Sequence, residues 1–465
     1  MEVVGERVVV SGAGKNMWLG EDEFYFVSKA VRGDFLLTAS IGFLGVGVDA
    51  HRKMGVQARV GLGAGAVHVT GVVHGDGMSC LQFRRTVGAM TEEVRAELEG
   101  AETVEIERKG GKFVVRVAKA GSRGGMWEEM DVELGGQAGA EMEVGFFVCS
   151  HNEDVVERAE FWNVRWVAPA EEGLVPYRDY LGSVLEVVEV DSGVRRVVRR
   201  SEGNMEAPNW TVDGKHLIYN SGGRLYSVEL ATGVVAEVDT GFAVRNNNDH
   251  VLSFDGKWMG LSHHVAEEGG GSVVFAMPME GARSTGVPKR VTARGPSYLH
   301  GWSPDGRYVL YTAERGDGNY DIYRCPADGS GGEERLTTAE GLDDGSEYSP
   351  DGRWIWFNSV RTGRMQLFRM RADGSGQEAM TGDGWNNWFP HVSPDGKRVV
   401  FLSYLDEVLP GDHPYYKRCA LREMAAGGGA ARVLAFVYGG QGTINVPSWS
   451  PDGRHVAFVS HSGAV

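Results

Sequence analysis

One four-residue motif, Ser-Pro-Asp-Gly, recurs through the second half of the chain. It begins at Ser303, Ser349, Ser393 and Ser450. Val212-Asp213-Gly214 and Phe254-Asp255-Gly256 are degenerate copies of its last three positions. The six aspartates are 42, 50, 46, 44 and 57 residues apart. A repeat of this length indicates an array of one supersecondary unit rather than a helical enzyme core.

Each copy of the motif predicts a tight turn between two antiparallel strands. Proline pre-sets φ at the second position, aspartate tolerates the third, and glycine takes a positive φ at the fourth. An apolar strand follows the turn, as in 308–311 or 354–357. A third and a fourth strand follow in each repeat, for example 321–324 and 335–337. Four antiparallel strands per repeat form one blade of a β-propeller, so we predict an all-β fold.

These repeats resemble the TolB-like propeller family, which has WD40-like repeats. The resemblance covers roughly residues 180–465. It implies a six-bladed β-propeller domain at 181–465 and, because TolB-like proteins are usually periplasmic, a periplasmic or extracellular location. Residues 1–5 show no basic and apolar regions of a secretory signal, so a cytoplasmic location stays open.

The last repeat ends before its outer strands are complete. Residues 455–459 read as its second strand, and only six residues remain. Residues 183–198 read as a strand, an Asp-Ser-Gly turn and another strand. Since an unpaired sheet edge is a liability, we predict that 183–198 pairs with 447–460 and closes the ring.

Residues 1–168 carry no repeat and read as alternating strands between glycine-rich turns, which indicates a β-sandwich. A short helix is expected near 91–98. Asn16-Met17-Trp18, Lys53-Met54-Gly55-Val56 and residues 159–164 resemble the concanavalin A-like sandwich found beside carbohydrate-active domains. That resemblance implies a glycan-binding accessory role. Residues 169–180, with two prolines and an acidic pair, read as a linker.

Composition excludes several classes of partner. The net charge is −16, which argues against nucleic acid or an anionic membrane surface. No apolar run is long enough to span a membrane. Cys80, Cys149, Cys325 and Cys419 lack zinc-ligand spacing and are expected to be buried free thiols, with a Cys80–Cys149 disulfide as the alternative.

One rim of the propeller is expected to collect polar and aromatic groups. The start of the first strand and the end of the second lie on the same rim of an up-and-down blade, and the turns lie on the other. The candidate substrate-binding residues of this rim are Asn204, Glu206, Asn248, Tyr298, Asp344, Trp388, Tyr415 and Asn445.

A divalent metal ion on the propeller axis is one hypothesis for this rim. Its candidate ligands are His250, His300, His391 and Gln441, together with Glu347. Imidazole and oxygen ligands suit Mn²⁺, Fe²⁺, Zn²⁺ or Ni²⁺, with Ca²⁺ as a further candidate. Oligogalacturonate lyases, which are related propellers, carry a His/Gln metal site. The alternative is that these histidines form hydrogen bonds between blades.

Metal-free catalysis is the second hypothesis. Glycoside hydrolysis needs two carboxyl groups, and Asp249, Glu314, Asp344, Glu347 and Asp406 are candidates. Polysaccharide β-elimination needs a base and a cation near the uronate. Candidates for these roles are His264, His300, Tyr404, Arg315 and Arg361. The alternative is that the rim acids and arginines pair with each other.

The sequence therefore predicts a carbohydrate-active protein that binds, and cleaves as a hydrolase or lyase, an oligosaccharide or polysaccharide. The alternative is a non-catalytic TolB-like scaffold that binds a protein or peptide. No G-x-S-x-G elbow and no HExxH motif occur, so a serine hydrolase of that type and a zinc protease are set aside.

Overall fold

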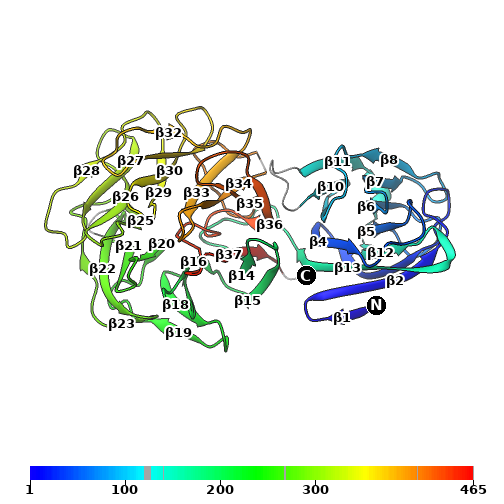
Figure 1. Ribbon diagram of the computed structural model, residues 1–465, viewed down its shortest axis with the longest axis horizontal. Helices are drawn as coiled ribbons and strands as arrows, with labels where there is room; N and C mark the ends of the chain where they lie inside the picture. Colours follow the sequence, from blue (N-terminus) through cyan, green and yellow to red (C-terminus); the bar gives the residue numbers. More distant parts are fainter. Residues whose placement is uncertain (120–126, 140, 267–268, 406, 464–465) are drawn as a thin grey trace. The chain divides into compact units, whose positions relative to one another are not determined.

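The computed structural model describes the chain except for residues 120–126, 140, 267–268, 406 and 464–465. The chain divides into two compact units (Figure 1). Unit 1 comprises Met1–Pro169 with Ser462–Val465, and unit 2 comprises Ala170–His461. Among the described residues, no helix combines the length and the apolar character that crossing a membrane would need.

Unit 1 is built from two antiparallel sheets. The seven-stranded sheet has the order β1 (Glu2–Val4), β2 (Arg7–Gly14), β13 (Asn152–Val167), β4 (Phe35–Phe43), β9 (Thr103–Lys109), β10 (Lys112–Ala118) and β11 (Trp127–Glu133). The six-stranded sheet has the order β3 (Tyr25–Arg32), β12 (Glu141–Cys149), β5 (Lys53–Arg59), β6 (His68–His74), β7 (Ser79–Arg84) and β8 (Glu92–Arg95). A short 3-10 helix, η1 (Gly135–Ala138), precedes β12.

The expected helix near 91–98 is wrong. Residues 92–95 form β8, which pairs antiparallel with β7, with Phe83 opposite Glu92 and Cys80 opposite Arg95. The pairing partner decides the structure here, because the free edge of β7 offers backbone hydrogen bonds that a short isolated helix could not match.

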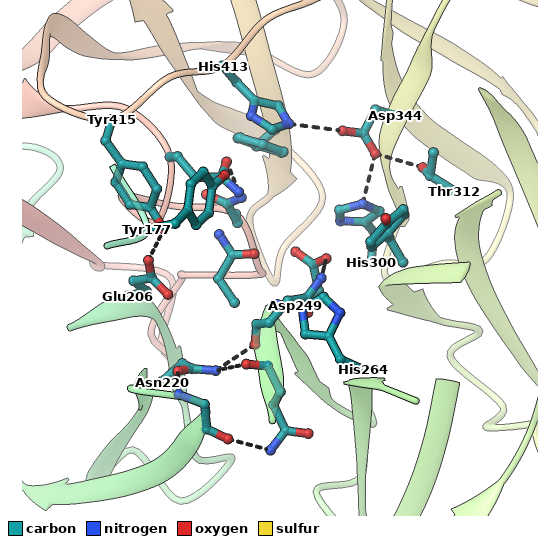
Figure 2. Close-up of a pocket in the computed structure, with 18 of the residues that line it drawn as sticks. Tyr177, Glu206, Asn220, Asp249, His264, His300, Thr312, Asp344, His413 and Tyr415 are labelled. Atoms are coloured by element: carbon teal, nitrogen blue, oxygen red, sulfur yellow. Dashed lines mark hydrogen bonds and ion pairs between the residues drawn. The ribbon is translucent and has the colours of Figure 1, made fainter. Parts of the chain in front are cut away.

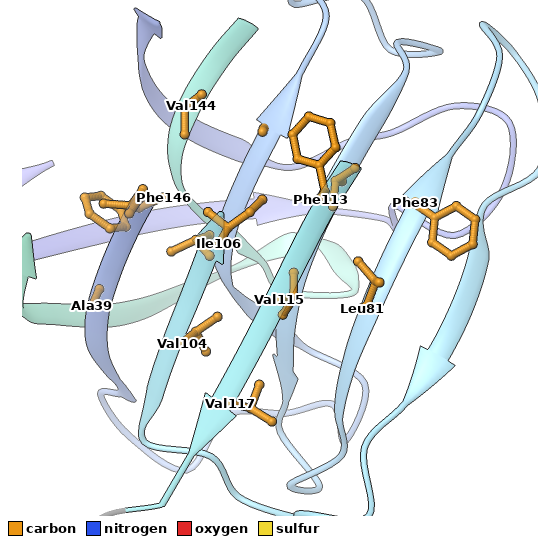
Figure 3. Packing of buried hydrophobic residues seen from close by; sticks show 14 of the residues in the cluster. Ala39, Leu81, Phe83, Val104, Ile106, Phe113, Val115, Val117, Val144 and Phe146 are labelled. Atoms are coloured by element: carbon orange, nitrogen blue, oxygen red, sulfur yellow. The ribbon is translucent and has the colours of Figure 1, made fainter. Parts of the chain in front are cut away.

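One apolar core lies between the two sheets of unit 1 (Figure 3). In β10, Phe113, Val115 and Val117 are fully buried in it. The sheets approach closely at Gly71, where a Cβ would lie 2.6 Å from Cγ1 of Val104 in the other sheet. The alternation of strand side chains therefore produces a sandwich of the kind that the sequence indicates.

A segment of the chain itself covers the other face of the six-stranded sheet. The fully buried carboxylate of Asp22 pairs with Arg84 at 2.6 Å and with Arg59 at 3.3 Å. Arg84 also donates to the carbonyl of Leu19 at 2.6 Å. Asp22, Arg59 and Arg84 are thus paired with one another within the domain.

Within the described residues, unit 2 contains six antiparallel sheets. The first is β16 (Glu206–Trp210), β17 (His216–Ser221), β18 (Arg224–Glu229) and β19 (Val235–Val238). The second is β20 (Asn246–Leu252), β21 (Trp258–His264), β22 (Ser272–Glu280) and β23 (Arg283–Ser284), with β24 (Lys289–Arg290) also paired to β22. The third is β25 (Ser297–Trp302), β26 (Tyr308–Glu314), β27 (Tyr320–Pro326) and β28 (Glu334–Arg335).

The remaining three sheets of unit 2 continue the series. The fourth is β29 (Asp343–Tyr348), β30 (Trp354–Ser359), β31 (Gln366–Arg371) and β32 (Glu378–Ala379). The fifth is β33 (Asn386–Val392), β34 (Arg398–Tyr404), β35 (Lys417–Ala425) and β36 (Arg432–Gly439). The sixth has the order β15 (Arg195–Ser201), β14 (Gly182–Glu189) and β37 (His455–Ser462).

The repeated motif forms the turn between the first and second strands, as the sequence predicts. The hydroxyl of Ser303 donates to Asp305 Oδ1 at 2.6 Å, and the amide of Gly306 donates to the Ser303 carbonyl at 2.8 Å. Gly306 has a φ of 70°. The same serine–aspartate hydrogen bond recurs at Ser349, Ser393 and Ser450.

The segment before the first repeat joins the last strand of the chain, which is the pairing expected for 183–198. β14 lies between β15 and β37, and the amide of Val190 donates to the carbonyl of Arg454 at 2.9 Å. The sixth sheet also contacts the first. There the side-chain amide of Asn209 donates to the Pro447 carbonyl at 2.6 Å. All four cysteines are buried and free, as expected.

We predict that Gly396→Ala lowers the free energy of unfolding of the propeller by about 1–2 kcal/mol. Gly396 has a φ of 71°, and a Cβ there would meet no atom within 4 Å, so the cost comes from the backbone alone. Gly332 also has open space around it but no positive φ, so Gly332→Ala is the matched control. Denaturant unfolding of both variants measures the difference, and equal values would contradict the turn assignment.

Candidate functional site

The first strand of each of the first five sheets contains an irregularity that divides it in two. Register shifts interrupt the pairing of β16, β20, β25, β29 and β33 with their neighbours. An extra residue in a strand changes the direction in which the following side chains point. Residues before the shift, such as Glu206 and Asp344, line a cavity at one end of the ring, whereas Asn209 and Glu347 line a separate cavity at the other end.

The larger cavity, which we call the mouth, has a volume of about 710 Å³ (Figure 2). Strand residues of the first five sheets line it, and the loop between β36 and β37 adds Gln441 and Asn445. The polar and aromatic side chains that line it are Tyr177, Tyr180, Asn204, Glu206, Asn220, Asn246, Asn247, Asn248, Asp249, His264, Tyr298, His300, Thr312, Tyr320, Asp344, Phe389, His413, Tyr415, Gln441 and Asn445. None of the described lining residues is a lysine or an arginine.

The carboxylate of Asp344 contacts three side chains of the mouth, those of His300, Thr312 and His413 (Figure 2). Its Oδ1 lies 2.8 Å from His300 Nε2 and accepts a hydrogen bond from the Thr312 hydroxyl at 2.7 Å. Its Oδ2 lies 3.9 Å from His413 Nε2. Burial disfavours the charged forms of Asp344 and His300, but the attraction between the carboxylate and the imidazolium outweighs this effect. It lowers the pKa of Asp344 to about 2 and, with help from Asp249, raises the pKa of His300 to about 9.

Asp249 lies in the same mouth in a different environment. It is 4% exposed and accepts a hydrogen bond from the Asn247 side chain at 2.8 Å. Burial, reinforced by the charge of Asp344 and only partly offset by His300, raises the pKa of Asp249 to about 6. The mouth therefore holds two carboxyl groups whose surroundings move their pKa values apart, which is the arrangement used for general acid catalysis.

Tyrosine side chains also line the mouth. The hydroxyl of Tyr415 donates to Glu206 Oε1, and the rings of Tyr177 and Tyr415 lie edge to face with 4.9 Å between centroids. Burial raises the pKa of Glu206 and raises the pKa of Tyr298 to about 12. Tyrosine rings of this kind offer both a stacking surface and a hydroxyl to a ligand.

Four buried polar atoms of the described residues that line the mouth have no hydrogen-bond partner. They are Oδ1 of Asn204, Oδ1 of Asn246, Nδ2 of Asn248 and Nδ1 of His300, and the four residues are 8%, 5%, 4% and 5% exposed. An unsatisfied buried donor or acceptor costs roughly 1–3 kcal/mol, so a ligand that paired with these atoms would recover that energy.

The structure does not bring the predicted metal ligands together. Both ring nitrogens of His250 face backbone carbonyls, those of Asn248 at 3.1 Å and Ile218 at 3.3 Å. His391 Nδ1 binds Glu347 at 2.7 Å, and its Nε2 binds the carbonyl of Ile444. Both histidines lie beyond the irregularity of their strand, so they bridge sheets as the alternative interpretation held. His300 and Gln441 do line the mouth.

Several predicted catalytic residues also lie outside the mouth. Arg315 binds Glu333 at 2.7 Å, and Arg361 binds Asp343 at 2.7 Å. Glu314 accepts from the amide of Gly318 at 2.9 Å, and the hydroxyl of Tyr404 donates to the Pro414 carbonyl at 3.0 Å. Each of these four side chains thus has a hydrogen-bond partner outside the mouth. Asp406 lies outside the described residues, whereas Asp249 and His264 line the mouth as predicted.

The predicted substrate-binding residues are largely brought together. Asn204, Glu206, Asn248, Tyr298, Asp344, Tyr415 and Asn445 line the mouth. Trp388 is fully buried behind it, with its ring 4.6 Å from that of His413. The sequence interpretation missed Tyr177 and Tyr180, which it assigned to the linker. Two tyrosines within four positions after Pro176 were the available signal.

Comparison with known proteins identifies the family. The TolB beta propeller domain matches residues 300–409. An uncharacterized protein of Agrobacterium fabrum, Atu1656, is 46% identical over 280 residues, which is 60% of this chain and 92% of that protein. A solved structure of a candidate TolB from Agrobacterium tumefaciens is 45% identical with a TM-score of 0.57, covering 61% of this chain and 99% of that one. This chain belongs to the TolB β-propeller family.

Other likenesses are weaker. The Tol-Pal system protein TolB of Francisella tularensis is 28% identical over 242 residues, or 49% of this chain, and the chain spans only 52% of that protein. An oligogalacturonate lyase in complex with manganese covers 55% of this chain at 13% identity, with 67% of that protein covered and a TM-score of 0.35. A likeness that low carries no argument about metal binding or catalysis here.

We predict that His300 makes the stability of unit 2 fall as pH rises from 6.5 to 9. Its folded pKa of about 9 lies above the value of 6.5 that an exposed histidine has, so the folded state keeps a proton that the unfolded state loses. The loss should be on the order of 1–3 kcal/mol, and His300→Gln should abolish it.

His250→Gln is the matched control for this experiment. His250 is equally buried, but desolvation lowers its pKa to about 4, so it does not titrate between pH 6.5 and 9. Denaturant unfolding at several pH values measures the slope. A slope that His300→Gln leaves unchanged would contradict the His300–Asp344 ion pair.

Proposed function

We propose that the mouth binds an oligosaccharide or polysaccharide and hydrolyses it with Asp249 and Asp344. The observation that carries this proposal is the divergence of their pKa values, about 6 for Asp249 and about 2 for Asp344, within one cavity. Glycoside hydrolases need one carboxyl group that holds a proton and a second that stays ionised.

The roles follow from these environments. Asp249 donates its proton to the glycosidic oxygen as the C–O bond breaks. Asp344, kept ionised by His300 and Thr312, stabilises the positive charge that develops at the anomeric carbon. Its Oδ2 has the weaker contact, 3.9 Å to His413, and is therefore the oxygen available to the substrate or to the incoming water. A water molecule then adds to the sugar, and a proton returns to Asp249.

Binding would use the remaining surface of the mouth. The tyrosine rings provide stacking faces for a sugar, and the unpaired atoms of Asn204 and Asn248 provide an acceptor and a donor for hydroxyl groups. Hydrolysis is favoured over β-elimination of a uronate because the candidate cations for a lyase, Arg315 and Arg361, are bound to acids outside the mouth. The reaction uses carboxyl groups and needs no metal ion.

The architecture proposed with this function has three parts. These are a concanavalin-like sandwich at 1–168, a linker at 169–180 and a six-bladed propeller at 181–465 closed by β14 and β37. Glycan binding is assigned to the propeller mouth, because Asp22 and its neighbours cover one face of the six-stranded sheet. A periplasmic or extracellular location fits such a substrate.

The alternative is a non-catalytic scaffold whose mouth binds a protein or peptide. Membership of the TolB family favours it, since relatives include proteins named as Tol-Pal system components. Side-chain amides such as those of Asn204 and Asn248 can also pair with peptide groups.

Turnover of a panel of neutral oligosaccharides and polyuronates separates these proposals. We expect cleavage of a neutral substrate, and we expect Asp249→Asn to lower kcat by roughly 10²–10⁴-fold with little change in KM. Glu340, which is exposed and absent from the mouth, provides the control Glu340→Gln. Absence of cleavage across the panel, together with a co-purifying protein that Tyr415→Ala releases, would support the scaffold instead.

A further inference from the structure

A second group of potential ligands lies in unit 1. His74, Cys80 and Glu93 come from the adjacent strands β6, β7 and β8. One ligand atom from each lies within 4.8 Å of the others. His74 Nε2 and Cys80 Sγ are 3.9 Å apart. Sequence spacing gave no hint of this group, because its members are neighbours only through strand pairing.

We propose that His74, Cys80 and Glu93 bind one transition-metal ion of the zinc class. Imidazole nitrogen, thiolate sulfur and carboxylate oxygen are the three ligand types that zinc takes in proteins, and three protein ligands leave a position for water or a substrate group. The thiolate favours zinc over hard cations such as Mg²⁺ and Ca²⁺. On binding, Cys80 releases its thiol proton to solvent and its sulfur forms the bond to the metal.

The surroundings of the group are those of a supported site. His74 and Cys80 are 5% and 0% exposed, and the side chain of Glu93 is 8% exposed. The Glu93 carboxylate accepts from Gln82 at 2.9 Å and from Arg95 at 2.6 Å, which fixes its orientation. Hydrogen bonds of this kind orient ligating carboxylates in metal sites.

The imidazole of His74 presents its Nε2 to Cys80, while its Nδ1 is buried without a hydrogen-bond partner. The ring of His51 lies edge-on to that of His74 at 6.0 Å between centroids, and His51 is itself 5.7 Å from the ring of His151. Two further imidazoles therefore lie near the group.

The positive charge of Lys53 disfavours a metal ion bound by His74, Cys80 and Glu93. Its removal therefore tests the proposal. The buried ammonium of Lys53, which donates to Asn16 Oδ1 at 3.0 Å, is close enough to act electrostatically on both His74 and Cys80. A positive charge there weakens binding of a divalent ion. Removing that charge should therefore tighten the site, which a general loss of structure could not do.

The experiment measures Zn²⁺ binding to the full-length protein, with Co²⁺ as a spectroscopic probe. We expect one Zn²⁺ per chain and a thiolate-to-cobalt charge-transfer absorption. His74→Ala, Cys80→Ser and Glu93→Gln should each weaken binding at least tenfold. Lys53→Met should strengthen it severalfold.

Cys149→Ser is the matched control, since Cys149 is an equally buried free thiol of the same sheet that lies outside the group. The proposal is overturned if the wild-type chain binds no stoichiometric zinc. It is equally overturned if Cys80→Ser and Cys149→Ser bind alike, or if Lys53→Met weakens binding. These outcomes are independent of the carbohydrate assay, because that activity depends on unit 2.

Discussion

The irregularity in the first strand of each of the first five sheets is the constraint on which the propeller site depends. A regular strand would send alternate side chains to the same two faces along its whole length. The register shifts instead let one short strand supply Asp344 to the mouth and Glu347 to the opposite cavity, only three residues later. The same five strands thereby supply different side chains to the two ends of the ring.

Maintaining this arrangement requires unusual backbone conformations. Ala207 and Phe389 have φ values of 53° and 56°, and both lie within the shifts of β16 and β33. Such conformations cost of order 1–3 kcal/mol each for residues other than glycine and persist only where the surroundings enforce them. Here the amide of Ala207 donates to the Gly442 carbonyl at 2.7 Å, so a contact with the loop between β36 and β37 holds the first strand in place. Closure of the ring and the shape of its mouth are therefore linked.

Local rules made the turns and the closing strand predictable, because proline, aspartate and glycine restrict the backbone wherever they occur. Six of the candidate substrate-binding residues lie seven positions before a turn aspartate, and all of them but Trp388 line the mouth. The spacing of the motif could not predict that His250 and His391 lie outside the mouth. The register shifts change the direction of their side chains, and no sequence pattern marks those shifts. Arg315 and Arg361 failed as candidates for another reason, because each pairs with an acid 18 positions away that the fold brings close.

The charge balance of the mouth restricts what it can accept. Asp344 stays ionised with His300 as its counter-ion, and Asp249 adds negative charge above a pH of about 6. The described lining residues include no lysine or arginine to offset a further anion. An anionic ligand such as a uronate or a phosphate would have to lose its hydration shell beside these carboxylates without a compensating ion pair. A neutral, hydroxyl-bearing ligand avoids that cost and can still satisfy the unpaired atoms of Asn204, Asn248 and His300, so electrostatics and hydrogen bonding select the same chemical class.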